Sequence, residues 1–289
     1  MVSLMGSINF IIARAVAGSV PPLTLAFWRW MGMLLLMLGF AWPHFKRDWP
    51  QLRRRWRLLL VLAFTGVATY NSLSYVGVQT TTAINASLFQ SAAPIFVMLW
   101  AFVIFRERPG GYQLLGMVIS LTGVITIASR GSLQTLLHLS GNVGDLWIIA
   151  AIVIYSAYSP LLRIRPAVHP LSLLVGMVGL GTLMMLPFYL LELAQGARIQ
   201  GSWPSYAALL YTALFPSLVG YCCFNRGVEL IGAARAGQYT HLVPALGSLL
   251  AIVFLGEQFH LYHLVGAALI GAGLLTAARA RRAEPPPRA

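Results

Sequence analysis

Long apolar runs separated by short polar or charged breaks dominate the chain. A helix that crosses a bilayer needs about 20 mostly apolar residues, and none of these runs alternates as a membrane strand would. The pattern predicts ten membrane-crossing helices, over residues 1–18, 22–42, 57–79, 82–105, 111–129, 143–162, 170–191, 205–225, 235–255 and 261–278. Several breaks between them are too short to hold a soluble domain. We therefore expect an all-α integral membrane protein of ten transmembrane helices.

Composition agrees with this class and disfavours others. The 289 residues are 58% hydrophobic and 9% charged, whereas soluble domains carry about 25% charged residues. The net charge of +13 does not indicate a nucleic-acid partner, because the basic residues lie between apolar runs and not on one face. The adjacent Cys222 and Cys223 suggest neither a disulfide framework nor a metal site. We expect no cofactor and no metal.

The basic residues predict the orientation of the chain. If the N-terminus lies in the cytoplasm, the cytoplasmic loops and tail hold most of the Lys and Arg, and only Arg130 and Arg198 fall in loops on the opposite side. The positive-inside rule then places both termini in the cytoplasm. The apolar N-terminus shows no basic region followed by a small-residue cleavage site, so we expect a retained first span and not a removable signal.

The two halves of the chain match each other. At an offset of 150 positions, Pro94, Glu107, Gly116 and Gly123 correspond to Pro244, Glu257, Gly266 and Gly273. At an offset of 148, Pro22-Leu23-Thr24-Leu25 corresponds to Pro170-Leu171-Ser172-Leu173. Because five spans is an odd number, the second half must enter the membrane from the opposite side, as in many secondary transporters. We expect a first five-helix repeat at 1–130, a connecting loop at 131–142, an inverted second repeat at 143–280 and a basic cytoplasmic tail at 281–289.

These motifs resemble those of the EamA-type drug/metabolite transporter superfamily. The shared features are a proline within a span, a glutamate near its end and a glycine-rich span after it, present twice. Gly6-Ser7-Ile8-Asn9-Phe10, and Pro21-Pro22-Leu23-Thr24 followed by Arg29, are similar to the family's opening. Within the superfamily, the chain looks most like bacterial inner-membrane amino-acid exporters, aromatic amino acid exporters among them. The resemblance implies export of small metabolites through a central cavity.

The candidate substrate-binding residues are polar groups within the spans, because such groups face protein or water and not lipid. In the third span Asn71 and Tyr75 are four residues apart on one face, and in the eighth span Tyr221 and Asn225 appear in the opposite order. These amides and phenols would either orient a zwitterionic substrate or link helices by hydrogen bonds. The remaining candidates are Asn9, Arg29, Gln90, Ser91, Tyr155, Tyr158 and His241.

Two of these candidates carry ionisable groups. Arg29 lies roughly 10 Å into the second span, and no acidic residue is evident at similar depth. It would either cap freed backbone carbonyls or bind the carboxylate of a substrate. No Asp or Glu lies in mid-span. His241 is therefore the one side chain near a predicted cavity position whose charge would change close to physiological pH. Both a facilitator and a proton-coupled transporter fit this pattern.

Four matched residues are candidates for structural or gating roles. We expect Pro94 and Pro244 to lie inside the fourth and ninth spans, where each would kink its helix and free the carbonyl four residues earlier, for cavity lining or for packing. Glu107 and Glu257 end the same spans, and we expect them to make gate or helix-end contacts.

The sequence therefore predicts a secondary transporter of the bacterial inner membrane that exports amino acids, or related small metabolites, by alternating access. Its partners would be the small-molecule substrate and membrane lipid, and it would be a monomer or a weak homodimer. The same fold would also suit a multidrug exporter or a lipid flippase. An intramembrane enzyme is less favoured, because the few acids and scattered histidines assemble no catalytic set by spacing.

Overall fold

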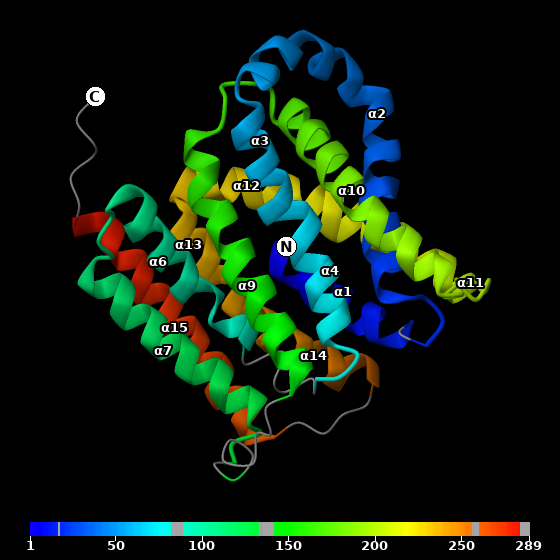
Figure 1. Cartoon of the computed structure of the whole chain (residues 1–289). Helices are drawn as coiled ribbons and strands as arrows, with labels where there is room; N and C mark the ends of the chain where they lie inside the picture. The colour runs from blue at the N-terminus through cyan, green and yellow to red at the C-terminus, as the bar shows by residue number, and fades with distance from the viewer. Residues whose placement is uncertain (17, 82–88, 133, 135–141, 256–259, 284–289) are drawn as a thin grey trace.

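The computed structural model describes residues 1–16, 18–81, 89–132, 134, 142–255 and 260–283. In this part of the chain all regular structure is helical (Figure 1). The elements are α1 (Val2–Ala15), α2 (Pro22–Arg54), α3 (Trp56–Ala63), η1 (Phe64–Ala68), α4 (Thr69–Gly77), α6 (Ala93–Phe105), α7 (Gly111–Ala128), α9 (Val143–Leu161), η2 (Leu162–Ile164), α10 (Pro170–Ala194), α11 (Trp203–Thr212), η3 (Ala213–Val219), α12 (Gly220–Ile231), α13 (Ala233–Gln238), η4 (Tyr239–His241), α14 (Leu242–Leu255) and α15 (Leu261–Ala283). Six helical stretches of the described chain are long and apolar enough to cross a membrane.

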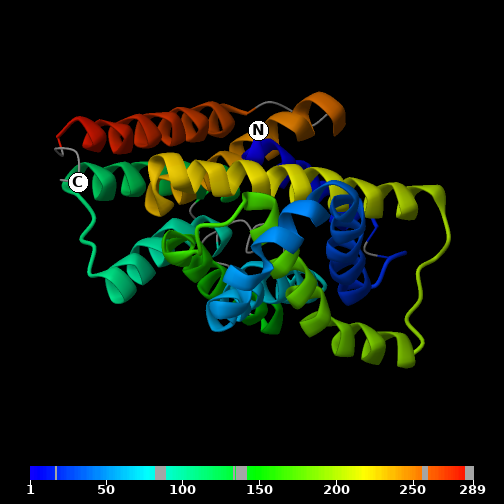
Figure 2. The same cartoon turned by 90° about the horizontal axis from the view of Figure 1, so that it is seen from above.

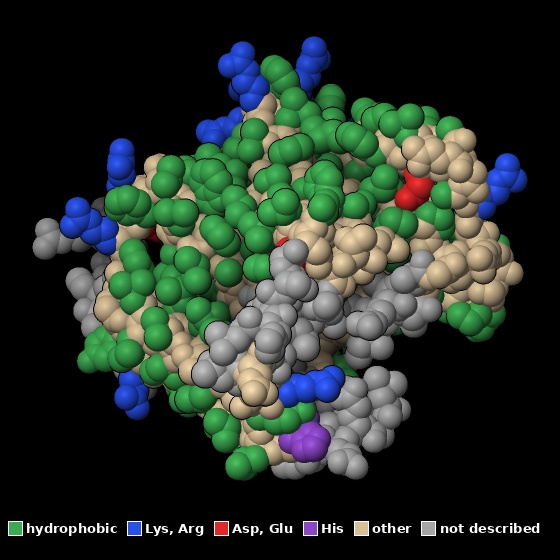
Figure 3. Space-filling model, turned by 60° about the horizontal axis from the view of Figure 1, so that its bottom comes forward, with side chains coloured by type: hydrophobic (Ala, Val, Ile, Leu, Met, Phe, Trp, Pro, Cys, Tyr) green, Lys and Arg blue, Asp and Glu red, His purple; other side chains and the backbone are tan. Residues whose placement is uncertain are grey.

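The surface of the molecule is apolar in the way that lipid requires. Large hydrophobic side chains are exposed on many helices, with Leu35 and Phe40 on α2, Leu183 on α10 and Leu210 on α11 all at least half exposed. Apolar side chains cover much of the face shown in Figure 3, and basic side chains lie mostly at its edges. A soluble protein rarely exposes so much contiguous apolar surface, and the chain is accordingly a multi-pass membrane protein.

The second predicted span is longer in the structure than the sequence pattern indicates. The apolar run ends near residue 42, but α2 continues to Arg54 through Pro43 and Pro50. A proline inside a helix removes one backbone hydrogen bond. Here the helix persists beyond Pro43 because Asp48 is buried and bound to the start of α10. A tertiary contact therefore extends an element whose local sequence predicts an end.

The sequence led us to expect Pro94 and Pro244 in helix interiors, but in the structure each proline lies in the first turn of a helix. Pro94 lies in the first turn of α6, which begins at Ala93, and Pro244 lies in the first turn of α14, which begins at Leu242. Proline is tolerated there because the first N–H groups of a helix have no partner within it. A turn at Ala92 precedes α6, and the 3₁₀ segment η4 precedes α14, so the α-helical hydrogen-bond pattern changes shortly before each proline.

α7 and α15 cross in very close contact, side by side in Figure 1. A Cβ added to Gly116 would lie 2.5 Å from the Gly273 carbonyl oxygen, and one added to Gly123 would lie 2.6 Å from that of Gly266. Small residues permit this approach of two backbones in a membrane. The four matched glycines of the sequence thus meet in one crossing.

A short π-helical segment interrupts each of two matched spans. η1 covers residues 64–68 and η3 covers 213–219, nearly the same positions at the 150-residue offset. Such segments are rare and often occur at functional sites. Both segments contact the polar groups of the candidate site.

Candidate functional site

Arg29 is the centre of a buried polar cluster. Its side chain is 4% exposed. Nη1 donates hydrogen bonds to Asn9 Oδ1, Asn71 Oδ1 and the Tyr75 hydroxyl at 3.2, 3.1 and 3.0 Å. Nε donates to the Ser217 hydroxyl of η3 at 2.6 Å. Elements α1, α2, α4 and η3 therefore meet at one guanidinium, and the structure brings together four of the candidates, Asn9, Arg29, Asn71 and Tyr75.

No described carboxylate neutralises this guanidinium. Each of the five acids in the described chain has another partner: Asp48 and Glu192 at helix starts, Glu107 and Glu229 in ion pairs with other arginines, and Asp145 at the start of α9, where it accepts from the Asn142 backbone N–H. The oxygens that bind Arg29 are all neutral. A charged group at the centre of a bilayer costs about 2.5–3.5 kcal/mol even on insertion scales, so a buried arginine of a membrane helix that has no counter-ion among the described residues is a marked electrostatic feature.

The open hydrogen-bonding positions beside Arg29 are donors. Within the described chain, Asn71 Nδ2 and Trp30 Nε1 are buried without an acceptor. The Trp30 ring lies 5.2 Å from the Arg29 Cζ atom. A buried donor without an acceptor is costly. A group that offers acceptor oxygens and negative charge, such as a carboxylate, would complement these two donors and the guanidinium charge.

A row of tyrosines lies next to this cluster. Tyr70 and Tyr155 have ring centroids 4.5 Å apart, and Tyr158 lies 5.9 Å from both Tyr155 and Tyr221. Tyr221 contacts Trp30 edge-on at 5.0 Å, so aromatic contacts continue to the indole beside Arg29. Aromatic rings at these separations offer faces and edges on which another ring can pack.

The hydroxyls of this row have specific partners. Tyr70 donates to Gln90 Oε1 at 2.9 Å, Tyr158 donates to Asn225 Oδ1 at 2.8 Å, and Tyr221 donates to the Gly66 carbonyl of η1. The two matched pairs therefore have different partners. Asn71 and Tyr75 bind Arg29, whereas Tyr221 and Asn225 bind the Gly66 carbonyl and Tyr158. The position of α10 that matches Arg29 at the 148-residue offset is the apolar Met177, so the Tyr221–Asn225 pair has no cation at that position.

His241 lies in a second buried polar group. Its Nε2 is 2.8 Å from the Ser91 carbonyl oxygen, and its Nδ1 is 2.7 Å from the Ser120 hydroxyl. Because a carbonyl only accepts, Nε2 carries a proton. Ser120 also lies within hydrogen-bond distance of the Met117 carbonyl, so its hydroxyl can donate to a neutral histidine or accept from a protonated one. No hydrogen bond recorded for the described chain joins this group to Arg29.

Glu107 forms an ion pair with Arg163, which joins the end of α6 to η2. Both side chains are nearly half exposed, and exposed pairs contribute about 0–1 kcal/mol to stability. The contact agrees with the expected helix-end role of this glutamate. Its counterpart Glu257 lies outside the described residues.

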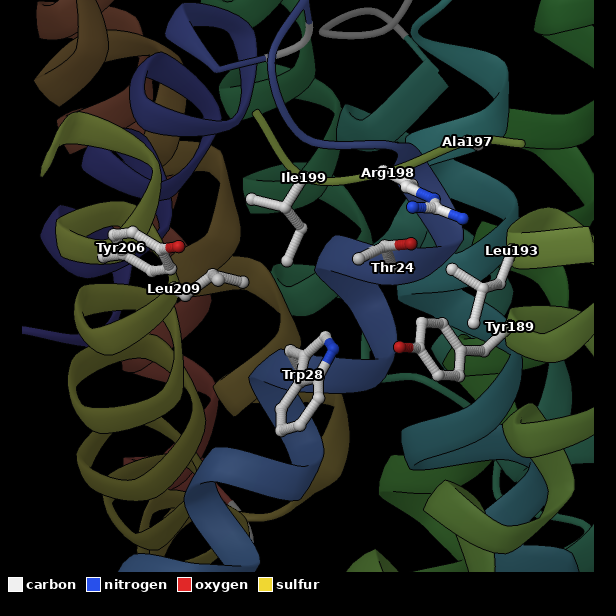
Figure 4. Close-up of a pocket in the computed structure, with 9 residues that line it drawn as sticks. All are labelled: Thr24, Trp28, Tyr189, Leu193, Ala197, Arg198, Ile199, Tyr206 and Leu209. Carbon is white, nitrogen blue, oxygen red and sulfur yellow. The ribbon is translucent and has the colours of Figure 1, made fainter. Parts of the chain in front are cut away.

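A cavity of about 400 Å³ is lined by other residues than these candidates (Figure 4). It is formed by the first turns of α2, the last turns of α10, the segment after α10 and α11. Its lining residues are Thr24, Trp28, Tyr189, Leu193, Ala197, Arg198, Ile199, Tyr206 and Leu209. None of the residues predicted to bind substrate lines it.

Three residues of the Arg29 cluster and the tyrosine row were not predicted from the sequence. Ser217 looks like one small polar residue in an apolar run, and only the adjacent Pro216 signals the distortion that turns it towards Arg29. Trp30 and Tyr70 carry no local signal either, since aromatic residues are common in membrane helices as interface anchors.

Comparison with known families identifies relatives over nearly the whole chain. The model of the EamA-like transporter family matches residues 1–129 and 142–279. The chain is 27% identical over 282 residues to the uncharacterized transporter YyaM of Bacillus subtilis, covering 95% of this chain and 90% of that protein. It is 28% identical over 260 residues to a probable terminal-alkyne amino-acid exporter of Streptantibioticus cattleyicolor, covering 87% of this chain and 82% of that protein.

A solved structure has the same fold. It is a crystal structure that superposes with a TM-score of 0.77 at 18% sequence identity, covering 98% of this chain and 96% of that chain. At this identity the likeness concerns the fold alone.

Proposed function

Because the chain belongs to the EamA-like transporter family, we propose that it exports amino acids, aromatic ones among them, or related small metabolites across the bacterial inner membrane by alternating access. The transporter names of its relatives support membrane transport in general. The name of the Streptantibioticus relative supports an amino acid as cargo. The multidrug and lipid-flipping alternatives share the fold and predict different substrates.

The proposed architecture is ten membrane spans in two inverted five-helix repeats, with both termini in the cytoplasm. The two separate matches of the family model support a duplication. The crossing of α7 and α15 through matched glycines supports it further, because equivalent elements of inverted repeats meet at their shared pseudo-two-fold axis.

One observation carries the substrate proposal: Arg29 is a buried cation whose partners in the described chain come from both halves and are all neutral, with the unpaired donors Asn71 Nδ2 and Trp30 Nε1 near it. A substrate carboxylate would accept hydrogen bonds from the Arg29 guanidinium and from the donors beside it, and charge-assisted hydrogen bonds are the strong ones. The adjacent tyrosine row would pack on an aromatic side chain. Of the remaining predicted residues, Gln90 and Asn225 would act through the tyrosines that they bind.

Counterflow in proteoliposomes tests this function. Purified protein would be supplied with labelled phenylalanine, tyrosine, leucine and lysine, first without an ion gradient and then with a pH gradient. We expect exchange of the aromatic amino acids, and loss of exchange when the carboxylate is converted to an amide. Movement of phosphatidylglycerol or cationic drugs in place of amino acids would contradict the proposal and favour the alternatives.

The pH arm of this experiment addresses His241. Exchange that is insensitive to the gradient indicates a facilitator, in which His241 links helices. If uptake requires the gradient, we expect His241→Gln to abolish the gradient dependence, because glutamine cannot take up a proton. The same substitution leaving the dependence intact would exclude His241 as the coupling group.

Gly66→Ala is expected to lower exchange about tenfold. A Cβ at this position would lie 2.5 Å from Tyr158 Cδ2, so the ring must move and its hydrogen bond to Asn225 must break. A buried hydrogen bond contributes about 0.5–1.5 kcal/mol, and 1.4 kcal/mol is tenfold. Gly179→Ala is the matched control, since its Cβ would have no atom within 4 Å. Equal exchange rates in the two variants would exclude a role for the Tyr158 position.

A further inference from the structure

Hydrogen bonds join α2 to α10 at both ends of the helix pair, and we call each set of bonds a fastening. The first fastening is formed by a carboxylate of α10. Glu192 accepts hydrogen bonds from the backbone N–H groups of Leu23 and Thr24 at 3.0 and 2.6 Å, and from the Thr24 hydroxyl at 2.7 Å. The first N–H groups of a helix have no partner within it, and their positive end favours an anion. Glu192 therefore caps the start of α2 from a neighbouring helix.

The second fastening repeats the first at the opposite ends of the two helices. Asp48 of α2 accepts hydrogen bonds from the His169 backbone N–H at 2.9 Å and from the Ser172 hydroxyl at 2.7 Å. Asp48 and Ser172 are buried. Thr24 and Ser172 occupy matched positions at the 148-residue offset. Each helix thus supplies a carboxylate near its end and a hydroxyl near its start.

A stacked pair of rings accompanies each carboxylate. Phe27 and Tyr189 are 4.4 Å apart with an interplanar angle of 3° at the Glu192 end. His44 and His169 are 4.0 Å apart with an angle of 8° at the Asp48 end. The two helices lie side by side over the length between these pairs (Figure 1). In Figure 2 the chain leaves the end of α10 as an extended segment before α11.

Contacts between equivalent elements have a special property in an alternating-access cycle of inverted repeats. When the two halves exchange conformations, the α2–α10 pair maps onto itself, and each fastening takes the place of the other. Both can therefore stay closed in both end states. The Glu107–Arg163 ion pair joins the non-equivalent elements α6 and η2, and the exchange replaces it by a different contact. Rocking of one repeat against the other is the usual form of such cycles.

We propose that the α2–α10 pair is the fixed axis of the transport cycle, and that Asp48 and Glu192 are positioning residues for Arg29; this rests on the transport function proposed above. Arg29 lies on α2 between the two fastenings, and its Nε is bonded to Ser217 of the other half. Holding both ends of α2 keeps the guanidinium in one place while the access routes open elsewhere. The α7–α15 crossing is a second pair of equivalent helices and lies at the other side of the molecule in Figure 1.

Cross-linking distinguishes an axis from a gate. The native Cys222 and Cys223 would first be replaced by alanine. Trp28→Cys/Tyr189→Cys joins α2 to α10 at the Glu192 end, where both residues line the cavity of Figure 4. His44→Cys/His169→Cys joins them at the Asp48 end. With a short bifunctional thiol reagent, we expect each cross-linked protein to retain at least half the exchange rate of its reduced form.

A third pair provides the contrast. Glu107→Cys/Arg163→Cys joins non-equivalent elements, and its cross-link is expected to lower exchange at least tenfold, with recovery when a cleavable linker is cut. If a cross-link at either end of α2–α10 stops exchange as completely as this one, the pair opens during the cycle and the proposal is wrong.

Conservative substitutions test the positioning role of the carboxylate caps. Thr24→Ser and Ser172→Thr each install the hydroxyl that the other half uses, and we expect near-parental KM values. Thr24→Val and Ser172→Ala remove the hydroxyl, and we expect KM to rise about threefold or more with a smaller change in kcat, because Arg29 is displaced. Equal KM values within each pair would overturn the positioning role.

A measurement without substrate separates this proposal from the transport assignment. If the reduced protein moves no amino acid, nitroxide labels at the same three pairs report the motion by their distance distributions in lipid at pH 5 and pH 8. We expect one narrow distance at each end of α2–α10 under both conditions and a broad or shifted one for the 107–163 pair. A second population at either end of α2–α10 would overturn the axis even if amino-acid transport is never observed.

Discussion

Arg29→Met is expected to lower counterflow of a carboxylate substrate by roughly 100-fold or more. Methionine stands at the matched position of the second half, Met177, where it is fully buried, so the side chain suits a packed membrane helix. The substitution removes the one cation of the cluster. Losing one partner of a buried, hydrogen-bonded charge pair costs about 2–5 kcal/mol, and each 1.4 kcal/mol is tenfold.

Two further variants show whether exchange depends on the charge of Arg29 or on the planar arrangement of its N–H donors. Arg29→Lys keeps the charge but offers a compact ammonium that cannot reproduce the bonds of Nε and Nη1 together. We expect it to retain exchange with a raised KM. Arg198→Gln removes an exposed arginine outside the cluster and should leave exchange unchanged. Initial rates in proteoliposomes and a thermal unfolding scan would be recorded for each. Exchange by Arg29→Met at the parental rate would exclude a carboxylate site here.

Gly273→Ala is expected to destabilise the protein by about 1–3 kcal/mol, although the change adds a single methyl group. Its Cβ would lie 2.5 Å from both the Gly116 carbonyl oxygen and the Ser120 backbone nitrogen. Backbone atoms cannot rotate away as the end of a side chain can, so α7 and α15 must separate. Overpacking of a tight interior has a cost in this range. The measurement is the unfolding temperature in detergent, with the folded fraction from size-exclusion chromatography.

Gly271→Ala is the control on the same helix. It makes the same chemical change two residues away, where a Cβ would have no atom within 4 Å. Alanine has the higher helix propensity by up to about 1 kcal/mol, so we expect an unchanged or slightly higher unfolding temperature. If both variants unfold at the same temperature, the close crossing does not contribute to stability.

The sequence by itself determined the class of fold and the positions of most helices. Apolar runs of bilayer length must form helices, because no water is present in the membrane core to satisfy an open backbone. The helix bounds of α7, α9 and α10 lie within a few residues of the predicted spans for this reason. The matched glycines were also visible in the sequence, since close helix contact demands small residues at fixed spacing. The family follows from these same repeated motifs.

The tertiary structure decided which polar groups meet. Asn9, Asn71 and Tyr75 were recognisable as polar residues in apolar spans, but only packing places them on one guanidinium. Ser217 reaches Arg29 across 188 positions of sequence. The extension of α2 past Pro43 and the start of α6 at Ala93 were likewise set by contacts of Asp48 and by the break before Pro94. Local patterns report the burial of each helix face, because burial repeats with the helix period. The partner of a single buried donor depends on the packing of distant helices, which leaves no periodic trace in the chain.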